Sequence, residues 1–594
     1  MAEVAKGHLP SRNNKHQSAE EYEYDSASVS SDEAQIGVKN IEAVSQTWTQ
    51  WSLIAAYLGI FLVAFCTSLE GQTTINLTVY ATSAFAEHSL VATVLVVQGV
   101  VNAVIKPPMA KIANVFGRLE AFCISVFIYV IGYIQMAGSN NVKAFASAQI
   151  FYSAGATGLQ ILIQIFVADT SDLLNRALFS SLPDVPFLIT VWAGPPIANR
   201  LLAHATWRWG YGLWSIVLPA AFMPLALSLL LNTRKAAKQG LLPHSPWKGR
   251  SVLDGLKNLW YELDVMGLLL LSAAISLILI PLTLAATAKD HWRNVSIIAM
   301  IVIGCLCLLV FLVWESMHKL APRPFLSLRL LTNRNVIAGC TIGFFYFAVF
   351  YTSIYPYFPS YLQVVQGDSV TAAGHITQTF TFTSTVSSIC ISLVIKYTRH
   401  YKYYITLGAC IYLLGVGLMI RYRSESSLTS QIVGTQLAMG IGGGMINVPA
   451  QLGVQAAVSH SDVAAATAIF LTIVEIGGAV GNAISGAVWT ANLQSRLVKY
   501  LPPSAQADAT LIFGNLTLAK SYVSGSLERT AINRSYQETM DILLIIAACL
   551  AAPLIPLSLI MRNYKLDTID QKVRGKVIGS GRPLDEGAPE VGGL

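Results

Sequence analysis

Long apolar stretches alternate with short polar ones along most of this chain. Because a helix needs about 20 mostly apolar residues to cross the hydrocarbon core of a bilayer, each stretch of that length predicts one membrane-spanning helix. The pattern predicts fourteen such helices, at residues 52–78, 89–107, 119–138, 145–167, 178–199, 211–231, 263–286, 295–314, 335–355, 371–395, 403–420, 429–449, 464–490 and 539–561. An even number of spans places both ends of the chain on the same side of the membrane.

Composition supports a membrane protein over a soluble one. Of the 594 residues, 54% are hydrophobic and only 12% are charged, whereas a soluble domain carries roughly 25% charged residues. The eight cysteines lie within apolar stretches and show no paired C-x-x-C spacing, which argues against a zinc site or a disulfide framework. We therefore predict an all-α integral membrane protein that is not an enzyme and binds no nucleic acid.

The basic residues predict the orientation of the chain in the membrane. If both ends are cytosolic, the segments on that side hold most of the 39 lysines and arginines, as the positive-inside rule expects. The N-x-[ST] sequons then fall on or near the outer side. Two of them, Asn515 and Asn533, lie in a long predicted outer loop and are candidate glycosylation sites.

The polar segments between the spans predict the domain organisation. Two short basic turns, at 106–118 and 396–402, occupy matching places in the chain and indicate two repeated halves, a common construction in transporters. The prediction is a 6+2+6 arrangement of helices. Its parts are a disordered cytosolic tail at 1–50, a six-helix half at 51–231, a cytosolic linker at 232–262, an inserted helix pair and cytosolic loop at 263–334, a second six-helix half at 335–561 that includes the outer loop 491–538, and a cytosolic tail at 562–594.

The turn between the second and third predicted spans carries a family motif. Residues 106–120 read Lys-Pro-Pro-Met-Ala-Lys-Ile-Ala-Asn-Val-Phe-Gly-Arg-Leu-Glu, which resembles the G-x-x-x-D-x-x-G-R signature of the major facilitator superfamily. Gly117 and Arg118 match the signature, and Asn114 replaces its acid. The resemblance implies a major facilitator fold with a gate at the cytosolic face, formed here by Lys111, Asn114, Gly117, Arg118, Asp169, Asp172 and Arg176. The missing acid leaves Asp169, Asp172 and Glu120 as alternative partners of Arg118.

Other stretches narrow the resemblance within this superfamily. Residues 68–76 look like the first-helix L-D-x-T-I-V-N element of fourteen-helix drug:proton antiporters, with Glu70 in place of the aspartate of that element. Residues 207–211, 262–264 and 535–540, together with the long last outer loop, look more like the fungal siderophore–iron transporters. The fifth span favours the second family, because residues 191–199 keep the Gly-Pro of the antiporter element but lack its two final glycines.

The resemblance to siderophore–iron transporters implies proton-coupled import of ferric hydroxamate siderophores by alternating access. The expected partners are the ferric siderophore, protons and the lipid bilayer. The iron stays bound within the siderophore, and the chain itself is expected to hold no metal or cofactor and to act as a monomer. The implied location is the plasma membrane, with endosomal vesicles as a second site. The alternatives are a multidrug:proton antiporter that exports amphipathic compounds and a non-transporting nutrient sensor, which the short C-terminal tail argues against.

Four titratable residues within or beside the spans are candidates for proton coupling. An acid at the centre of a bilayer costs around 2.5–3.5 kcal/mol on insertion scales, so it is seldom present without a function. The candidates are Glu475 in the middle of its span, Glu70 and Asp184 nearer the outer face and the start of the fifth span, and His375 at the outer end of the tenth. The structural alternative for these acids is an ion pair with Arg200, Arg421 or a backbone group.

Polar and aromatic side chains that lipid would not favour indicate a substrate cavity between the halves. A polar stripe follows one face of the fourth span, and aromatic residues crowd the ninth span and its outer end. Aromatic surface with hydroxyl donors suits a bulky, uncharged, amide-rich ligand. The substrate-binding candidates are Tyr57, Phe65, Gln98, Asn102, Gln160, Gln164, Trp192, Tyr346, Phe350, Tyr351, Tyr355, Gln378 and Asn447. Polar contacts between helices and an interfacial aromatic belt are the alternatives.

Overall fold

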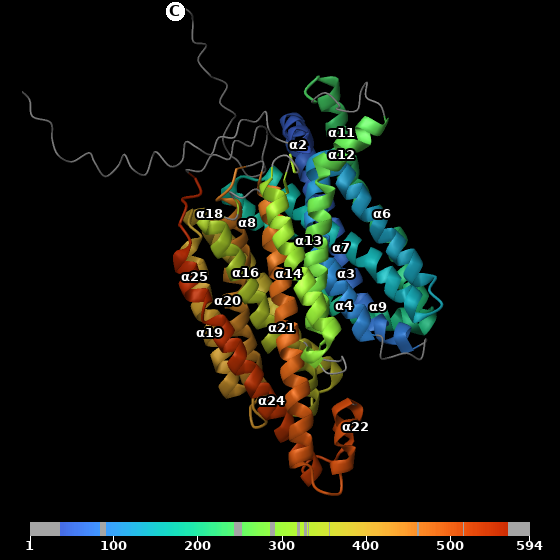
Figure 1. Ribbon diagram of the computed structural model, residues 1–594, viewed down its shortest axis with the longest axis vertical. Helices are drawn as coiled ribbons and strands as arrows, with labels where there is room; N and C mark the ends of the chain where they lie inside the picture. The colour runs from blue at the N-terminus through green and yellow to red at the C-terminus, as the bar shows by residue number, and fades with distance from the viewer. Residues whose placement is uncertain are drawn as a thin grey trace, which may run out of the picture.

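The computed structural model describes residues 36–83, 91–242, 252–285, 291–317 and 321–567, apart from residues 323, 326–329, 331, 356, 460, 461 and 515. Every regular element in these ranges is a helix, and the long helices lie side by side in one bundle (Figure 1). The predicted all-α class is confirmed for the described part of the chain.

Two groups of helices form the halves of the bundle. The first half contains α3 (Gln50–Ser83), α4 (Val91–Val104), α5 (Lys106–Phe116), α6 (Arg118–Ala137), α7 (Val142–Thr170), α8 (Leu173–Ser181), η3 (Leu182–Asp184), α9 (Phe187–His204), α10 (Trp207–Gly212) and α11 (Trp214–Lys238). The second half contains α16 (Arg334–Ser353), α17 (Phe358–Val364), α18 (Val370–Thr398), α19 (Lys402–Tyr422), α20 (Thr429–Gln455), α21 (Val463–Tyr500), α24 (Leu527–Ala551) and α25 (Leu554–Ile560). Between them lie α12 (Val252–Leu263) and the inserted pair α13 (Val265–Leu284) and α14 (Val295–Ser316).

The helices agree closely with the predicted spans. In the described residues, 13 helices are long and apolar enough to cross a membrane. They correspond to thirteen of the fourteen predictions. The remaining prediction, 89–107, falls on α4, which has 14 residues and is followed directly by α5.

The second span bends at Ile105 and does not end there. Hydrogen bonds between backbone groups four residues apart continue through Ile105. Pro107 and Pro108 have no N–H to donate, so the helix is interrupted for one residue and then restarts. The prediction of a cytosolic turn at 106–118 is therefore wrong for residues 106–116, which form α5. Its lysines, Lys106 and Lys111, are buried at 1% and 3% exposure.

The two ends of the bundle carry different segments. α2 (Ile36–Thr47), α12 and residues 561–567 lie at one end, here called the linker end, and α22 (Ala509–Gly514) lies at the other, the loop end (Figure 1). α2 packs against α5 and α11, and a Cβ added to Gly37 would lie 2.5 Å from the carbonyl oxygens of Ala113 and Asn114. The prediction of a disordered tail at 1–50 is therefore wrong for residues 36–50. Residues 1–35 lie outside the described residues.

At the loop end, two helices extend beyond their predicted spans. α21 continues to Tyr500, past the predicted end at residue 490, and α24 begins at Leu527, before the predicted start at residue 539. Trp489, one residue before the predicted end of its span, stacks its ring on that of Tyr357 with centroids 4.2 Å apart, and Arg496 in the extension of α21 forms an ion pair with Glu538 in the extension of α24. The predicted outer loop 491–538 is therefore largely helical, and α22 and α23 (Leu516–Ser521) occupy its middle.

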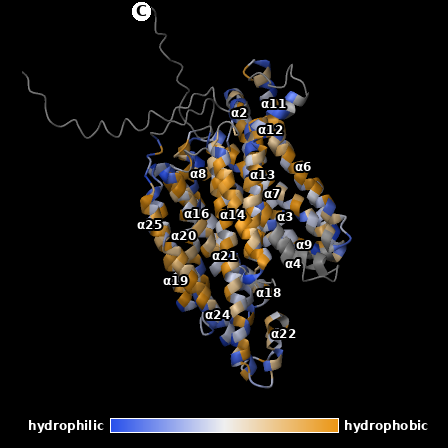
Figure 2. Ribbon diagram, in the orientation of Figure 1, coloured by the Kyte–Doolittle hydropathy of each residue, from blue (hydrophilic) through white to orange (hydrophobic). Residues whose placement is uncertain are grey.

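Hydrophobic residues dominate the helices between the two ends of the bundle (Figure 2), and many large hydrophobic side chains are exposed. The inserted helices α13 and α14 pack against each other, and α13 also packs against α4 of the first half and α21 of the second. Most of the apolar side chains of α14 stay exposed. An apolar band between polar ends suits a lipid environment.

Candidate functional site

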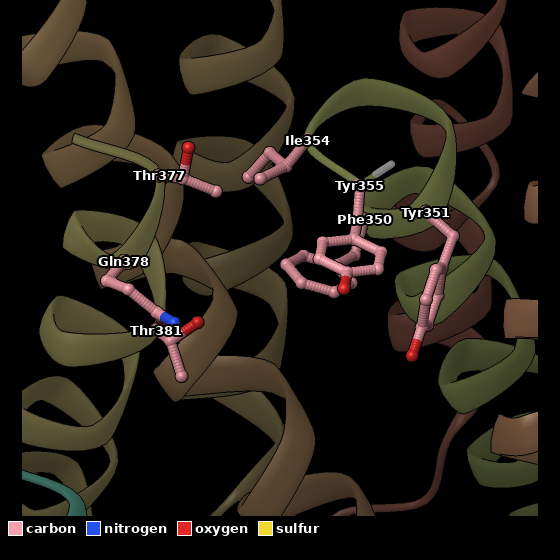
Figure 3. Close-up of a pocket in the computed structure, with 7 residues that line it drawn as sticks. All are labelled: Phe350, Tyr351, Ile354, Tyr355, Thr377, Gln378 and Thr381. Atoms are coloured by element: carbon pink, nitrogen blue, oxygen red, sulfur yellow. The ribbon is translucent and has the colours of Figure 1, made fainter. Parts of the chain in front are cut away.

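A cavity of about 210 Å³ lies in the second half, toward the loop end. It is lined by Phe350 and Tyr351 of α16, by Ile354 and Tyr355 in the turn that follows, and by Thr377, Gln378 and Thr381 of α18. Figure 3 shows the aromatic rings on one side and the hydroxyl and amide groups of α18 on the other. Four of the predicted substrate-binding residues therefore line one cavity: Phe350, Tyr351, Tyr355 and Gln378.

The local sequence explains why aromatic side chains gather there. α16 ends at Ser353, just before the Tyr355-Pro356 pair, because a residue that precedes proline avoids the helical conformation. The chain therefore turns at Ile354 and Tyr355. Phe350 also lies with its ring centroid 5.1 Å from that of Phe380 on α18, which joins the two walls of the cavity.

Side chains from the two halves meet on both sides of this cavity. Toward the loop end, Trp192 of α9 and His375 of α18 lie with their ring centroids 4.7 Å apart. Toward the linker end, Gln451 of α20 donates to Gln164 of α7 at 3.0 Å, and α8 packs against α18 and α20. Three predicted residues, Gln164, Trp192 and His375, are thus contacts between the halves.

The other predicted substrate-binding residues do not line the cavity. Gln98 of α4 donates to Gln149 of α7 at 2.6 Å. Asn102, one turn later, accepts from Thr157 of α7 at 2.8 Å. These bonds match the predicted alternative of polar contacts between helices. Of the rest, Tyr57 and Tyr346 are buried, Phe65 and Asn447 are partly buried, and Gln160 is exposed.

Glu70 of α3 is 1% exposed and lies among hydroxyl groups. Tyr129 of α6 donates to its Oε2 at 3.0 Å, and Tyr152 of α7 lies 3.2 Å from both carboxylate oxygens. Thr74, one turn further along α3, donates to Oε1 at 3.0 Å. Within the described residues, no basic side chain forms an ion pair with Glu70. Because hydroxyl groups both donate and accept, this surrounding can hold either the carboxylate or the carboxylic acid.

Two other predicted proton-coupling residues have more open surroundings. Asp184 ends the short helix η3 between α8 and α9, and its side chain is exposed. His375 is also exposed apart from its contact with Trp192. Of these three candidates, Glu70 combines burial with the absence of a cationic partner in the described part of the chain.

Glu475 of α21 forms an ion pair with Lys106 of α5, with 2.7 Å between Oε1 and Nζ. The lysine side chain is 2% exposed and the glutamate side chain 24% exposed. Glu475 therefore forms an ion pair, as the structural alternative predicts. Its partner is Lys106, however, and neither Arg200 nor Arg421. The sequence pattern places Lys106 in a cytosolic turn and therefore does not predict its contact with Glu475. Pro107 and Pro108 were the available signal, because proline favours the first turn of a helix.

Comparison with known proteins identifies the family. The model described as Major Facilitator Superfamily matches residues 56–282 and again residues 261–482. The siderophore iron transporter mirC of Emericella nidulans is 60% identical over 546 residues, which cover 92% of this chain and 90% of that protein. This chain belongs to the siderophore iron transporters of the major facilitator superfamily.

The MFS siderochrome iron transporter C of Aspergillus fumigatus is 59% identical, over 92% of this chain and 90% of its own length. Siderophore iron transporter 1 of Schizosaccharomyces pombe is 38% identical, over 90% and 86%. The predicted resemblance is confirmed.

In this siderophore transporter, the superfamily signature lies where α5 meets α6 at the linker end. Gly117 has a φ of 119°, a conformation that favours glycine, and it turns the chain directly into α6. Arg118 donates from Nε to Asp169 Oδ2 at 2.7 Å and from Nη1 to Asn114 Oδ1 at 3.0 Å. Asp169 is thus the partner of Arg118 among the three predicted alternatives. The asparagine that replaces the acid of the signature also binds this arginine.

The remaining gate residues of the transporter lie beside this pair. Asp172 precedes the first residue of α8, and its side chain accepts from the side-chain amide of Asn175 at 2.7 Å. Arg176 is 1% exposed and donates to the carbonyl oxygens of Ala168 and Ser171 at 2.9 and 3.2 Å. Lys111 Nζ lies 3.5 Å from the carbonyl oxygen of Pro324. The predicted gate residues therefore gather at one place, and their role as a gate stays a prediction.

Of the two predicted glycosylation sites of the transporter, the structure describes only Asn533. Asn515 lies outside the described residues. Asn533 is 7% exposed and its amide donates to Glu425 at 2.8 Å. The prediction for Asn533 is corrected, because this residue belongs to the folded helix α24 and not to an open loop, so a glycan on its amide would disrupt the packing.

Proposed function

We propose that this protein imports ferric hydroxamate siderophores together with protons across the plasma membrane, by alternating access of its two halves. The observation that carries the proposal is the similarity, along nine-tenths of the chain, to proteins named as siderophore iron transporters. The linker end would face the cytosol, because the basic segments of the chain gather on that side in the predicted topology.

The chemistry of the cavity supports this cargo. A ferric trihydroxamate is bulky and uncharged, because three hydroxamate anions balance the charge of Fe³⁺. The rings of Phe350, Tyr351 and Tyr355 offer apolar area to its body, and the polar groups of Gln378 and Thr381 can bind its oxygens. At about 210 Å³, the cavity is smaller than the roughly 300–1,000 Å³ of most small-molecule sites. Cargo binding would therefore require the surrounding helices to move apart.

The surroundings of Glu70 support proton coupling at that residue. A buried carboxylate without a cation costs free energy, and a proton removes that cost. The hydroxyl donors come from α6 and α7, so protonation changes how α3 is held by two neighbouring helices. Cargo and proton would then be linked through the arrangement of helices in the first half.

The contacts between the halves support alternating access. Toward the linker end the halves are joined by Gln164 and Gln451 and by the packing of α8 against α18 and α20. Toward the loop end, the rings of Trp192 and His375 meet. Cargo would enter from the loop end after the Trp192–His375 contact opens, and would leave after the linker-end contacts separate.

The test is uptake of radiolabelled iron in cells that lack their own siderophore transporters. Cells that express this protein should accumulate iron from at least one ferric hydroxamate, and a protonophore should abolish accumulation. Glu70→Gln should lose uptake, whereas Asp254→Asn, at an exposed acid on α12, should keep it. Failure to import any hydroxamate, together with increased drug resistance, would contradict the proposal and favour drug export.

A further inference from the structure

Lys106 and Glu475 belong to opposite halves of the bundle and lie far apart in the chain. Lys106 begins α5, just after the bend in the second span, and Glu475 lies twelve residues into α21. Their side chains meet at 2.7 Å, and the Lys106 ammonium group also lies 3.4 Å from the carbonyl oxygen of Leu471, one turn earlier on α21. A single buried lysine therefore binds the facing half through two groups.

The bend in the second span aims this lysine at the facing half. Because Pro107 and Pro108 interrupt the helix at Ile105, α5 restarts with Lys106 as its first residue. α5 packs against α21 and also continues directly into Gly117 and Arg118 at the linker end. One short helix thus carries both the ion pair between the halves and the residues of the superfamily signature.

The acid of the pair lies close to the wall of the cavity. Gly478 is one helical turn beyond Glu475, and a Cβ added there would lie 2.9 Å from Cε2 of Tyr351, which lines the cavity. α21 is therefore in direct contact with a cavity residue one turn from the ion pair. The ion pair lies on the linker-end side of the cavity, because Glu475 precedes Gly478 on a helix that starts at that end.

We propose that Lys106 is a positioning residue for transport, and that its ion pair with Glu475 is a latch that holds the two halves together on the linker-end side of the cavity. The latch opens once in each transport cycle, when the halves separate at that end. This inference rests on the proposed alternating access, but it does not depend on the identity of the cargo.

The physical basis of the latch is the cost of separating a buried ammonium group from a partly buried carboxylate. While the halves are closed, each charge compensates the other in surroundings that are largely shielded from water. When the halves separate, both groups need water or another partner. The pair therefore favours the conformation in which the linker end is closed, and removing either charge should favour the open one.

The test uses a cysteine reporter at the linker-end contact, in a chain whose eight native cysteines are replaced by serine or alanine. Ser180→Cys places the reporter on α8, beside the Gln164–Gln451 bond; Ser180 is 5% exposed and its carbonyl oxygen accepts from Gln164. Labelling by a membrane-impermeant maleimide in purified protein then measures how often the linker end opens. The variants are Lys106→Met, Lys106→Arg and Glu475→Gln, and thermal melting checks that each remains folded.

Lys106→Met and Glu475→Gln should each increase the labelling rate about tenfold or more, whereas Lys106→Arg should stay close to the parent rate because it keeps the charge. The matched control is Arg399→Met, which removes one partner of the Arg399–Asp567 pair within the second half and should not change labelling. Unchanged labelling in Lys106→Met would overturn the proposal, and so would equal increases in Lys106→Arg or Arg399→Met. If labelling follows the prediction but no siderophore is imported, the latch stands and the proposed cargo fails.

Discussion

Replacing Asp169 by asparagine removes the charge that balances Arg118 and keeps the shape of the side chain. Both side chains of this pair are 3% exposed, and Nε lies 2.7 Å from Oδ2. Removing one partner of a buried ion pair typically costs about 3–5 kcal/mol, because the other charge stays buried without compensation. Arg118 keeps its bond to Asn114, so we expect Asp169→Asn to cost about 3 kcal/mol of unfolding free energy, the lower end of that range. This corresponds to about two orders of magnitude in the folding equilibrium.

The measurement is reversible unfolding of the purified protein by SDS in mixed micelles. The matched control is Asp567→Asn, whose partner Arg399 is 51% exposed, because exposed ion pairs contribute little. A double variant, Arg118→Met with Asp169→Leu, should recover most of the loss, because it leaves no unpaired charge. The reasoning is refuted if Asp169→Asn costs no more than Asp567→Asn, or if the double variant is as unstable as the single one.

Three further changes test the packing, the cavity and the outer helix. Gly37→Leu should lower the melting temperature, because the new side chain meets backbone oxygens of α5. The control Gly71→Leu should not lower it, because nothing lies within 4 Å of a Cβ at that residue. Equal melting temperatures of the two variants would contradict the packing of α2 against α5. Phe350→Ala should raise the KM for siderophore uptake about tenfold, the loss of about 1.4 kcal/mol of aromatic contact, and Phe127→Ala, at an exposed ring on α6, should leave KM unchanged. Asn533→Gln should not change electrophoretic mobility, since this residue is buried; a glycosidase-sensitive shift would disprove that placement.

The spans were predictable because the length of an apolar run is a local property of the sequence. The same approach failed at Lys106, where a charge followed by two prolines resembled the end of a span. Its partner lies 369 residues away, and no local pattern connects the two. The prolines alone could have predicted the restart of a helix at this point.

The residue type of Glu70 makes it a candidate for proton coupling, but no pattern in the sequence predicts its surroundings. Its hydroxyl donors Tyr129 and Tyr152 lie 59 and 82 residues away on other helices. Only the folded arrangement of α3, α6 and α7 brings these hydroxyl groups to the carboxylate. The cavity shows the opposite case, since Phe350, Tyr351 and Tyr355 are close in sequence and belong to one visible aromatic run.

Hydropathy also could not show where helices continue outside the membrane. The first turns of α24 are polar and hold Arg529 and Asn533, yet both side chains are buried against neighbouring segments. α2 was missed for the same reason, because a short helix after a polar tail does not stand out by its composition. Both segments are ordered by contacts that form only in the folded bundle.

The central claim, coupled import of a ferric siderophore and protons, is tested most directly with purified protein in liposomes. Labelled ferric hydroxamate is offered outside, with an imposed inward proton gradient, an equal pH on both sides, or a protonophore. The account predicts accumulation above the external concentration only while the inward gradient lasts, and no accumulation by Glu70→Gln under any condition. Equal uptake with and without the gradient, or gradient-driven accumulation by Glu70→Gln, would contradict it.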